Sequence, residues 1–101
     1  MAREAGGVSL IRALVRTAQY DWSHHVNERI EDGQFDQADL EACIASGVVT
    51  KTTRDRRQDS VGKKVYTILG RDTRGRPFYT AGKILRVNGS LYFFITAHEA
   101  G

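Results

Sequence analysis

The fold is decided by residues 35–53, which read FDQADLEACIASGVVTKTT. Asp36 is a favourable helix N-cap, and Asp39, at the third helical position, lies near the positive end of the helix dipole. Leu40 lies four residues after the cap, where it can form a hydrophobic staple with the apolar residue that precedes the cap. Gly47 suits a left-handed C-cap, and beyond it the period of the apolar residues changes from helical to two. The stretch therefore predicts a capped helix followed directly by a strand.

The rest of the chain extends this plan in both directions. Helical spacing predicts a helix over residues 8–18, with a partly extended segment as the alternative because it is short and contains branched residues. Ser23 is the predicted N-cap of a second helix over residues 24–30. Residues 20–22 are expected to form an extended link. Alternating and β-branched stretches predict four strands, at residues 48–53, 64–69, 78–87 and 91–98. We therefore expect an α+β domain in which two or three N-terminal helices pack on a four-stranded antiparallel sheet.

Size and composition bound the class of protein. A chain of 101 residues forms one domain, with residues 1–19 as a helical extension and residues 20–101 as the core. The single cysteine, Cys43, falls on an apolar helix stripe, and it excludes a disulfide framework and a cysteine-based zinc site. We expect no metal and no other cofactor. No apolar run is long enough to span a membrane and no secretory signal is visible, so we expect a cytoplasmic protein without membrane contact.

The net charge of +3 conceals an uneven distribution along the chain. Residues 1–50 carry 4 Lys or Arg and 8 Asp or Glu, whereas residues 51–76 carry 9 basic and 3 acidic residues. A basic segment of this size can neutralise RNA phosphates and release their counterions. Lysine and arginine also protect exposed strand edges, so the charge alone leaves both explanations open. The phosphate-binding candidates in this segment are Arg56, Arg57, Arg71 and Arg76.

The dipeptide Asn88-Gly89 predicts a two-residue hairpin turn in which Val87 opposes Ser90. In that register one face of the hairpin is apolar and is assigned to the core. The other face carries the nucleic-acid-binding candidates Tyr79, Lys83, Tyr92, Phe94 and Thr96, together with His98. Aromatic side chains beside a cation are typical of surfaces that stack bases and bind phosphate. The alternatives are that the aromatic residues only stabilise the sheet, or that a one-residue shift in register exchanges the two faces.

Histidine and arginine side chains are the candidates for catalysis. His25 and Arg29 are four residues apart and therefore share a face of the second predicted helix. Histidine titrates near neutral pH and can act as general acid or base, and an arginine beside it can stabilise charge that develops on a phosphate. His98, on the last strand, is the second candidate acid or base. A structural role for His25 in packing is the alternative.

Several short motifs resemble a known family. The order and spacing of that family's motifs match five stretches of this chain: SHHVNERI at residues 23–30, the capped helix at 36–47, YTILGR at 66–71, GRPF at 75–78 and ITAH at 95–98. These motifs, which span residues 20–100, resemble the domain-of-unknown-function family 4258. The resemblance implies the fold of RelE-type and BrnT-type toxins, with two helices packed on a small antiparallel sheet. It also implies metal-independent RNA cleavage, by attack of a ribose 2′-hydroxyl on the adjacent phosphate.

The resemblance assigns roles to particular residues. It implies that His25 and Arg29 are the polar residues of the helix, and that Arg71, Arg76 and Thr96 are those of the sheet. The chain departs from the family's pattern at residues 31–33, where Glu-Asp-Gly replaces a usual second arginine, and at His98, where tyrosine is common.

Two functions are therefore expected from the sequence. The first is a toxin-like RNA-cleaving domain in which His25, Arg29 and His98 are catalytic, with a cognate antitoxin or another protein as a further partner. The second is a non-catalytic module that binds nucleic acid or an acidic protein segment through the same surface. The nuclease requires its histidines and arginines to converge in one cleft, whereas the binding module requires only a continuous basic surface.

Overall fold

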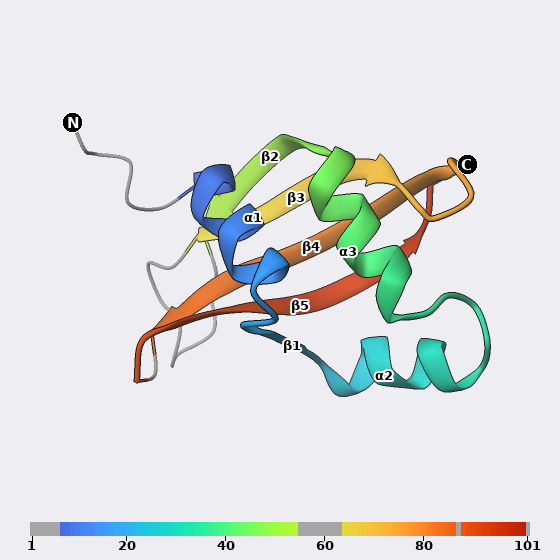
Figure 1. Ribbon diagram of the computed structural model, residues 1–101, viewed down its shortest axis with the longest axis horizontal. Coiled ribbons are helices and arrows are strands. Elements are labelled where there is room, and N and C mark those ends of the chain that lie inside the picture. Colours follow the sequence, from blue (N-terminus) through green and yellow to red (C-terminus); the bar gives the residue numbers. More distant parts are fainter. Residues whose placement is uncertain (1–6, 55–63, 87, 101) are drawn as a thin grey trace.

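The computed structural model describes residues 7–54, 64–86 and 88–100, which form three helices and a five-stranded sheet (Figure 1). In chain order the elements are α1 (Gly7–Arg16), β1 (Tyr20–Trp22), α2 (His24–Glu31), α3 (Gln37–Ser46), β2 (Val48–Arg54), β3 (Lys64–Arg71), β4 (Pro77–Arg86) and β5 (Ser90–Glu99). The strand order in the sheet is β1-β5-β4-β3-β2. The expected α+β plan is confirmed. None of the helices in these ranges is long and apolar enough to cross a membrane.

The sheet is mixed, which corrects the expected four-stranded antiparallel sheet. Strands β2 to β5 pair antiparallel as expected, but residues 20–22, expected to be a link, form an edge strand that runs parallel to β5. Backbone hydrogen bonds from Tyr92 N–H to Gln19 O (3.1 Å) and from Ser23 N–H to Phe94 O (2.9 Å) continue this pairing beyond both ends of β1. A strand of three residues is too short to show a period of two, and its partner lies far along the chain, so no local pattern marks it.

The two predicted helix caps are confirmed. Ser23 caps α2 by accepting a hydrogen bond from Val26 N–H, and its hydroxyl donates to Ile95 O at 2.8 Å. Asp36 and Asp39 form a reciprocal capping box at the start of α3. These bonds satisfy backbone N–H groups that a helix leaves unpaired at its first turn, so both helices begin at defined positions.

The helix α3 ends differently from the expected left-handed cap. Gly47 has φ −92° and ψ 171°, which is extended backbone open to any residue. Only glycine fits at this position, because a Cβ here would lie 2.5 Å from Cys43 O and 2.6 Å from a methyl group of Ile68. A Cβ at Gly70 would likewise lie 2.9 Å from Gly47 Cα. The two glycines therefore let the C-terminal end of α3 pack directly on the backbone of β3.

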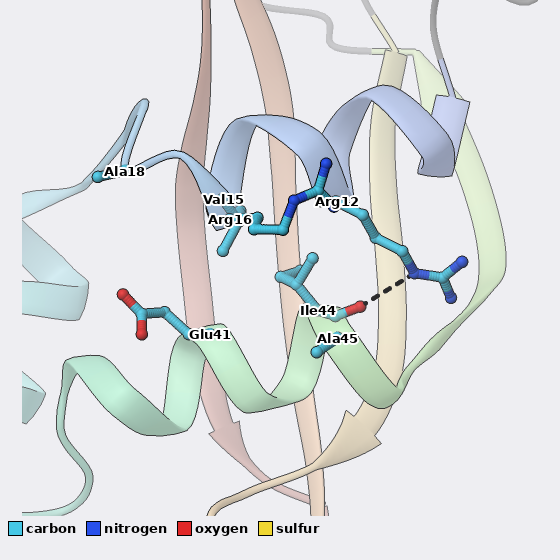
Figure 2. A pocket seen from close by; sticks show the side chains of 7 residues that line it. All are labelled: Arg12, Val15, Arg16, Ala18, Glu41, Ile44 and Ala45. Carbon is cyan, nitrogen blue, oxygen red and sulfur yellow. Dashed lines mark hydrogen bonds between the residues drawn. The ribbon is translucent and has the colours of Figure 1, made fainter.

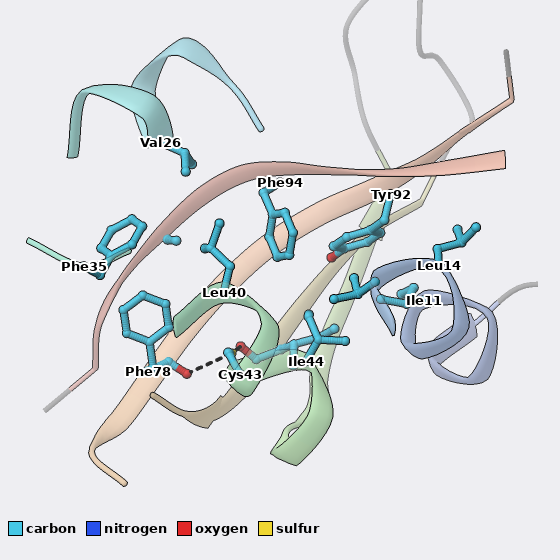
Figure 3. Packing of buried hydrophobic residues seen from close by; sticks show 13 residues of the cluster. Ile11, Leu14, Val26, Phe35, Leu40, Cys43, Ile44, Phe78, Tyr92 and Phe94 are labelled. Carbon is cyan, nitrogen blue, oxygen red and sulfur yellow. Dashed lines mark hydrogen bonds between the residues drawn. The ribbon is translucent and has the colours of Figure 1, made fainter. Parts of the chain in front are cut away.

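The hydrophobic core lies between the sheet and the two helices that cover one of its faces. Figure 1 shows α1 and α3 over this face, with α2 beside the edge that β1 and β5 form. Figure 3 shows α3 contributing Leu40, Cys43 and Ile44 to the core, where all three are at most 1% exposed. Burial raises the pKa of the Cys43 thiol to about 11, and its Sγ donates to Phe78 O at 3.3 Å. The expected core position of Cys43 is confirmed.

The β4–β5 hairpin has a longer connection than the expected two-residue turn. Arg86, not Val87, pairs with Ser90, so the predicted pairing of Val87 with Ser90 is wrong; Val87 itself lies outside the described residues. Asn88 and Gly89 do have the expected positive φ, at 54° and 110°. The register shifts again between Ala81 and Gly82, where Ile95 of β5 has no partner. This bulge offsets the longer connection, and the predicted pairs are correct from Ala81 with Thr96 onward.

Candidate nucleic-acid interface

The candidate interface lies on the face of the sheet opposite α1 and α3, which we call the helix-free face. Residues that pair on neighbouring strands point to the same side of a sheet, so the register aligns one residue from each of four strands. We call this set the bulky row; it consists of Val48, Leu69, Tyr79 and His98. The rings of Tyr79 and His98 stack with centroids 4.5 Å apart and an interplanar angle of 25°. Val48 is 61% exposed and Leu69 is 41% exposed, and because the two residues pair, they form adjacent apolar surface.

A second row of smaller side chains lies beside the bulky row, two residues along each strand. We call it the short-chain row; it consists of Thr67, Ala81 and Thr96. Lys51 pairs with Thr67 and continues this row to the edge strand β2, where its side chain is exposed. Threonine hydroxyls and lysine ammonium groups are common ligands of nucleic-acid phosphates. Of the sequence-predicted sheet residues, the structure therefore brings Tyr79, Thr96 and His98 together on one face.

Three other predicted sheet residues do not contribute to the exposed surface. Tyr92 and Phe94 are both 0% exposed and belong to the core, so their predicted place on the binding face is wrong. The cause is the longer hairpin connection, which exchanges the two faces of β5 between the turn and the bulge at Ile95. Lys83 does lie on the helix-free face, opposite Phe93, but it is only 5% exposed and offers no exposed charge there.

The Tyr92 side chain leaves a buried polar group without a partner. Its hydroxyl makes no hydrogen bond within the described part of the chain, and burial raises the pKa of the phenol strongly. Gly82 provides the space for the ring, because a Cβ at that position would lie 2.6 Å from both the Cζ and the hydroxyl oxygen of Tyr92. The free energy gained by burying the ring therefore offsets the cost of leaving the hydroxyl without a hydrogen bond.

The predicted histidine–arginine pair forms on α2. Arg29 Nε donates to His25 Nε2 at 3.3 Å, and Arg29 Nη1 donates to Gln34 Oε1 at 3.0 Å. This contact places the Arg29 guanidinium directly beside the imidazole of His25 on one face of the helix. The bond between Ser23 and Ile95 O anchors the start of α2 to β5 at the bulge. The pair therefore occupies the helix that borders the sheet beside β5 (Figure 1).

The second candidate histidine lies in a different group of side chains. His98 is exposed, stacks on Tyr79, and places its Nδ1 2.9 Å from Glu99 O. Within residues 7–54, 64–86 and 88–100, no hydrogen bond or ion pair connects His98 with His25 or Arg29. The candidate catalytic side chains thus form two groups, one on α2 and one on the helix-free face. The hydrogen bond from Ser23 to Ile95 O joins α2 to β5, the strand that carries His98.

Acidic side chains compensate the charge of Arg76. Its Nε lies 3.0 Å from Asp72 Oδ2 and its Nη1 lies 3.3 Å from Glu99 Oε2. Burial of Asp72 opposes its ionisation, but backbone N–H groups of the turn and the Arg76 side chain outweigh this effect and hold the pKa of the carboxyl below its usual value. Arg76 therefore orders the β3–β4 turn, which weakens its expected role in binding phosphate. Arg56 and Arg57, the other basic candidates, lie outside the described residues.

A hollow that sequence reasoning missed lies at one end of the bulky row. Its volume is about 260 Å³, and it is lined by Ser46, Val48, Leu69, Gly70, Arg71 and Pro77. Arg71 is exposed; its Nη1 donates to Gly75 O at 2.8 Å, and it has no carboxylate partner within the described residues. The guanidinium group therefore retains donors for an anionic ligand. The hollow depends on the packing of α3 against β3, and no local motif marks it.

A larger hollow of about 430 Å³ lies between α1 and α3, on the opposite layer of the molecule (Figure 2). Its lining is mostly apolar, with Arg16 and Glu41 at its margins. Arg12 Nε donates to Ile44 O at 3.3 Å and Arg12 Nη2 donates to Gly47 O at 2.6 Å. These bonds satisfy carbonyl groups at the end of α3 and tie α1 to it, so Arg12 has a structural role here.

Comparisons with known proteins leave the family open. Within the described ranges, no cluster of three or more His, Cys, Asp or Glu side chains is placed to hold a metal ion. No protein-family model, curated protein or solved structure matches the chain.

Proposed function

We propose that this protein binds single-stranded RNA through the helix-free face of its sheet. The observation that carries the proposal is the stacked pair of Tyr79 and His98 on that face, at the end of the sheet where Arg71 is also exposed. Aromatic rings on a sheet stack with unpaired bases, and nearby cations attract the phosphates. The short-chain row adds the hydroxyl groups of Thr67 and Thr96 within the same surface.

The test measures binding of a labelled single-stranded RNA by fluorescence anisotropy, with the same sequence as a duplex for comparison. Tyr79→Ala removes the ring and is expected to weaken binding by about 1–3 kcal/mol, the usual value of one stacked base. Tyr79→Phe keeps the ring and is the matched control, expected to bind as the wild type does. Each phosphate contact on a single strand should contribute about −0.7 to the log–log salt slope, and Arg71→Ala should flatten that slope. Equal affinity of the Tyr79→Ala and wild-type proteins would contradict the proposal.

We propose metal-independent RNA cleavage as a second function, carried by His25 and Arg29 on α2, which borders the helix-free face beside β5, together with His98 on that face. The observation that favours it is the contact between Arg29 and Nε2 of His25, because it places a cation that can stabilise phosphate charge beside a side chain that can act as general base. In this reaction His25 takes the proton of a ribose 2′-hydroxyl, the 2′-oxygen bonds to the phosphorus, and the bond to the 5′-oxygen breaks. His98 protonates that leaving oxygen, and Arg29 stabilises the charge on the phosphate.

Cleavage is tested on the same RNA with and without a chelator. The rate should be unaffected by the chelator and bell-shaped in pH, and His25→Ala or His98→Ala should each lower it by about 10²–10⁴-fold. The matched control is His24→Ala. His24 precedes His25 on α2 and is highly exposed, and its Nε2 lies 3.0 Å from Glu28 Oε2, whereas His25 contacts Arg29. Equal rates for the His24→Ala and His25→Ala proteins would exclude this mechanism and leave RNA binding as the function.

A further inference from the structure

The bulky row and the short-chain row run side by side across the strands of the helix-free face. Neighbouring strands are about 4.8 Å apart, so the bulky row covers about 14 Å from His98 on β5 to Val48 on β2. The chemistry changes along the bulky row, from stacked rings at β5 and β4 to exposed aliphatic side chains at β3 and β2. The short-chain row presents only threonine and alanine from β5 to β3, and Lys51 continues it on β2.

The two rows differ in height because their side chains differ in length. Tyr79 and His98 extend well beyond the methyl group of Ala81 and the short side chains of the two threonines. The next row on the far side pairs Val65, Lys83 and Phe93, of which Lys83 and Phe93 are longer than the threonines. The short-chain row therefore lies between two rows that hold longer side chains on β4 and β5, and it is directed across the strands.

Positive charge lies at the β2 ends of the two rows. Lys51 is exposed at the β2 end of the short-chain row, and Arg71 lines the hollow beside the β2 end of the bulky row. Among the described residues of the two rows there is no acidic side chain. A polyanion that carries planar bases on one side matches this arrangement, since its charge faces Lys51 and Arg71 while its bases reach apolar and aromatic surface.

We propose that a single RNA strand crosses the sheet from β5 to β2, with its phosphates over the short-chain row and its bases along the bulky row. This inference rests on the RNA-binding function proposed above and extends it to a path and a length. Stacked nucleotides rise about 3.4 Å per residue, so a row of about 14 Å contacts about four nucleotides. Val48 and Leu69 contact the base farthest from the stacked rings, and Arg71 binds the phosphate next to it.

The length of the contact is tested first with unstructured RNA oligomers of increasing length. Affinity is expected to rise steeply up to about four nucleotides and then to increase only weakly, because further nucleotides lie beyond the two rows. Affinity that continues to rise by an equal factor per nucleotide well beyond this length would overturn the proposed path.

The position of the path is tested with two variants of the rows. Ala81→Leu enlarges the middle of the short-chain row, and Leu69→Ser removes apolar contact from the β3–β2 part of the bulky row. Each should weaken binding of a six-nucleotide RNA by about tenfold, equivalent to about 1.4 kcal/mol. Leu69→Ser should leave binding of a dinucleotide unchanged, because the stacked rings alone accommodate it. The matched control is Ala45→Leu, the same enlargement at an exposed position of α3 on the opposite layer, which should bind as the wild type does.

The outcomes separate this inference from the proposed function. If no RNA of any length binds the wild-type protein, both fail. If RNA binds and Tyr79→Ala weakens it, while Ala81→Leu and Leu69→Ser have wild-type affinity and wild-type thermal stability, the proposed function stands and the path across the rows is wrong. Ala81 is only 6% exposed, so the exposed Leu69 position decides the test if the Ala81 variant unfolds.

Discussion

The substitution Gly70→Ala tests the packing of α3 against the sheet most directly. The added methyl group would lie inside the contact distance of Cys43 O and only 2.9 Å from Gly47 Cα and 3.0 Å from Gly47 N. All three atoms belong to the backbone and cannot rotate away, so the helix must move from the strand. Overpacking costs about 1–3 kcal/mol, and the rigid surroundings place this case at about 2–3 kcal/mol.

The assay is urea unfolding followed by the fluorescence of Trp22, the only tryptophan, which is half-buried against the core. With a slope of about 2 kcal/mol per molar, the midpoint should fall by about 1 M without a change in slope. The neighbouring substitution Leu69→Ala is the comparison, because Leu69 points to the helix-free face and is 41% exposed. It should cost less than about 1 kcal/mol. A larger loss for Leu69→Ala than for Gly70→Ala would show that the two faces of β3 are reversed, and would refute this reasoning.

Three further outcomes are expected from the core and the α3 cap. Leu40→Ala should cost about 2–5 kcal/mol by denaturant unfolding, because Leu40 is 0% exposed and its loss leaves a cavity; a cost near zero would place it outside the core. Tyr92→Phe removes the buried hydroxyl that has no partner within the described residues, and should raise the melting temperature; a fall would reveal a hydrogen bond to that hydroxyl. Burial opposes ionisation of Asp39, but hydrogen bonds from Thr73 and from the helix cap outweigh it and lower the pKa of Asp39 in the folded state. Stability from this carboxylate is therefore present above about pH 4 and lost as the pH falls through the folded pKa, so Asp39→Asn should be less stable at pH 7 and should show a weaker dependence on pH below 4.

The helices and most strands could be predicted because their signals are local. Ser23 and Asp36 mark helix starts with side-chain oxygens that accept from backbone N–H groups within three residues. The change of period after Gly47 marks the start of β2 for the same reason. Gly47 itself shows the limit of local reasoning, because its small size serves a contact with Cys43 and Ile68, and the latter is 21 residues away.

The register of the last hairpin could not be predicted because the decisive stretch has no alternation. Residues 91–95 read LYFFI, and five consecutive apolar residues do not show which of them face the core. Gly82 carried a usable signal, since a glycine inside a strand often marks the close approach of another group. Here that group is the ring of Tyr92, which crosses above the missing Cβ and thereby fixes Tyr92 on the core side.

Part of the candidate site was predicted correctly, because two irregularities of the hairpin offset each other. The longer connection shifts the register by one residue and places Tyr92 and Phe94 in the core, and the bulge at Ile95 shifts it back. Thr96 and His98 therefore keep the face that the simple two-residue turn assigns to them. A bulge also bends its strand and increases its twist, and Ile95 O at this bulge accepts the hydroxyl of Ser23 at the start of α2. The same irregularity thus sets the faces of the outer half of β5 and fixes the position of the helix that carries His25 and Arg29. Deletion of Ile95 would place Thr96 directly after Phe94, and regular alternation would then keep Thr96 and His98 on the helix-free face. The deletion should therefore lower stability, because the bulge carbonyl that accepts from Ser23 is lost, while the folded protein keeps RNA binding; Ile95→Val should keep both.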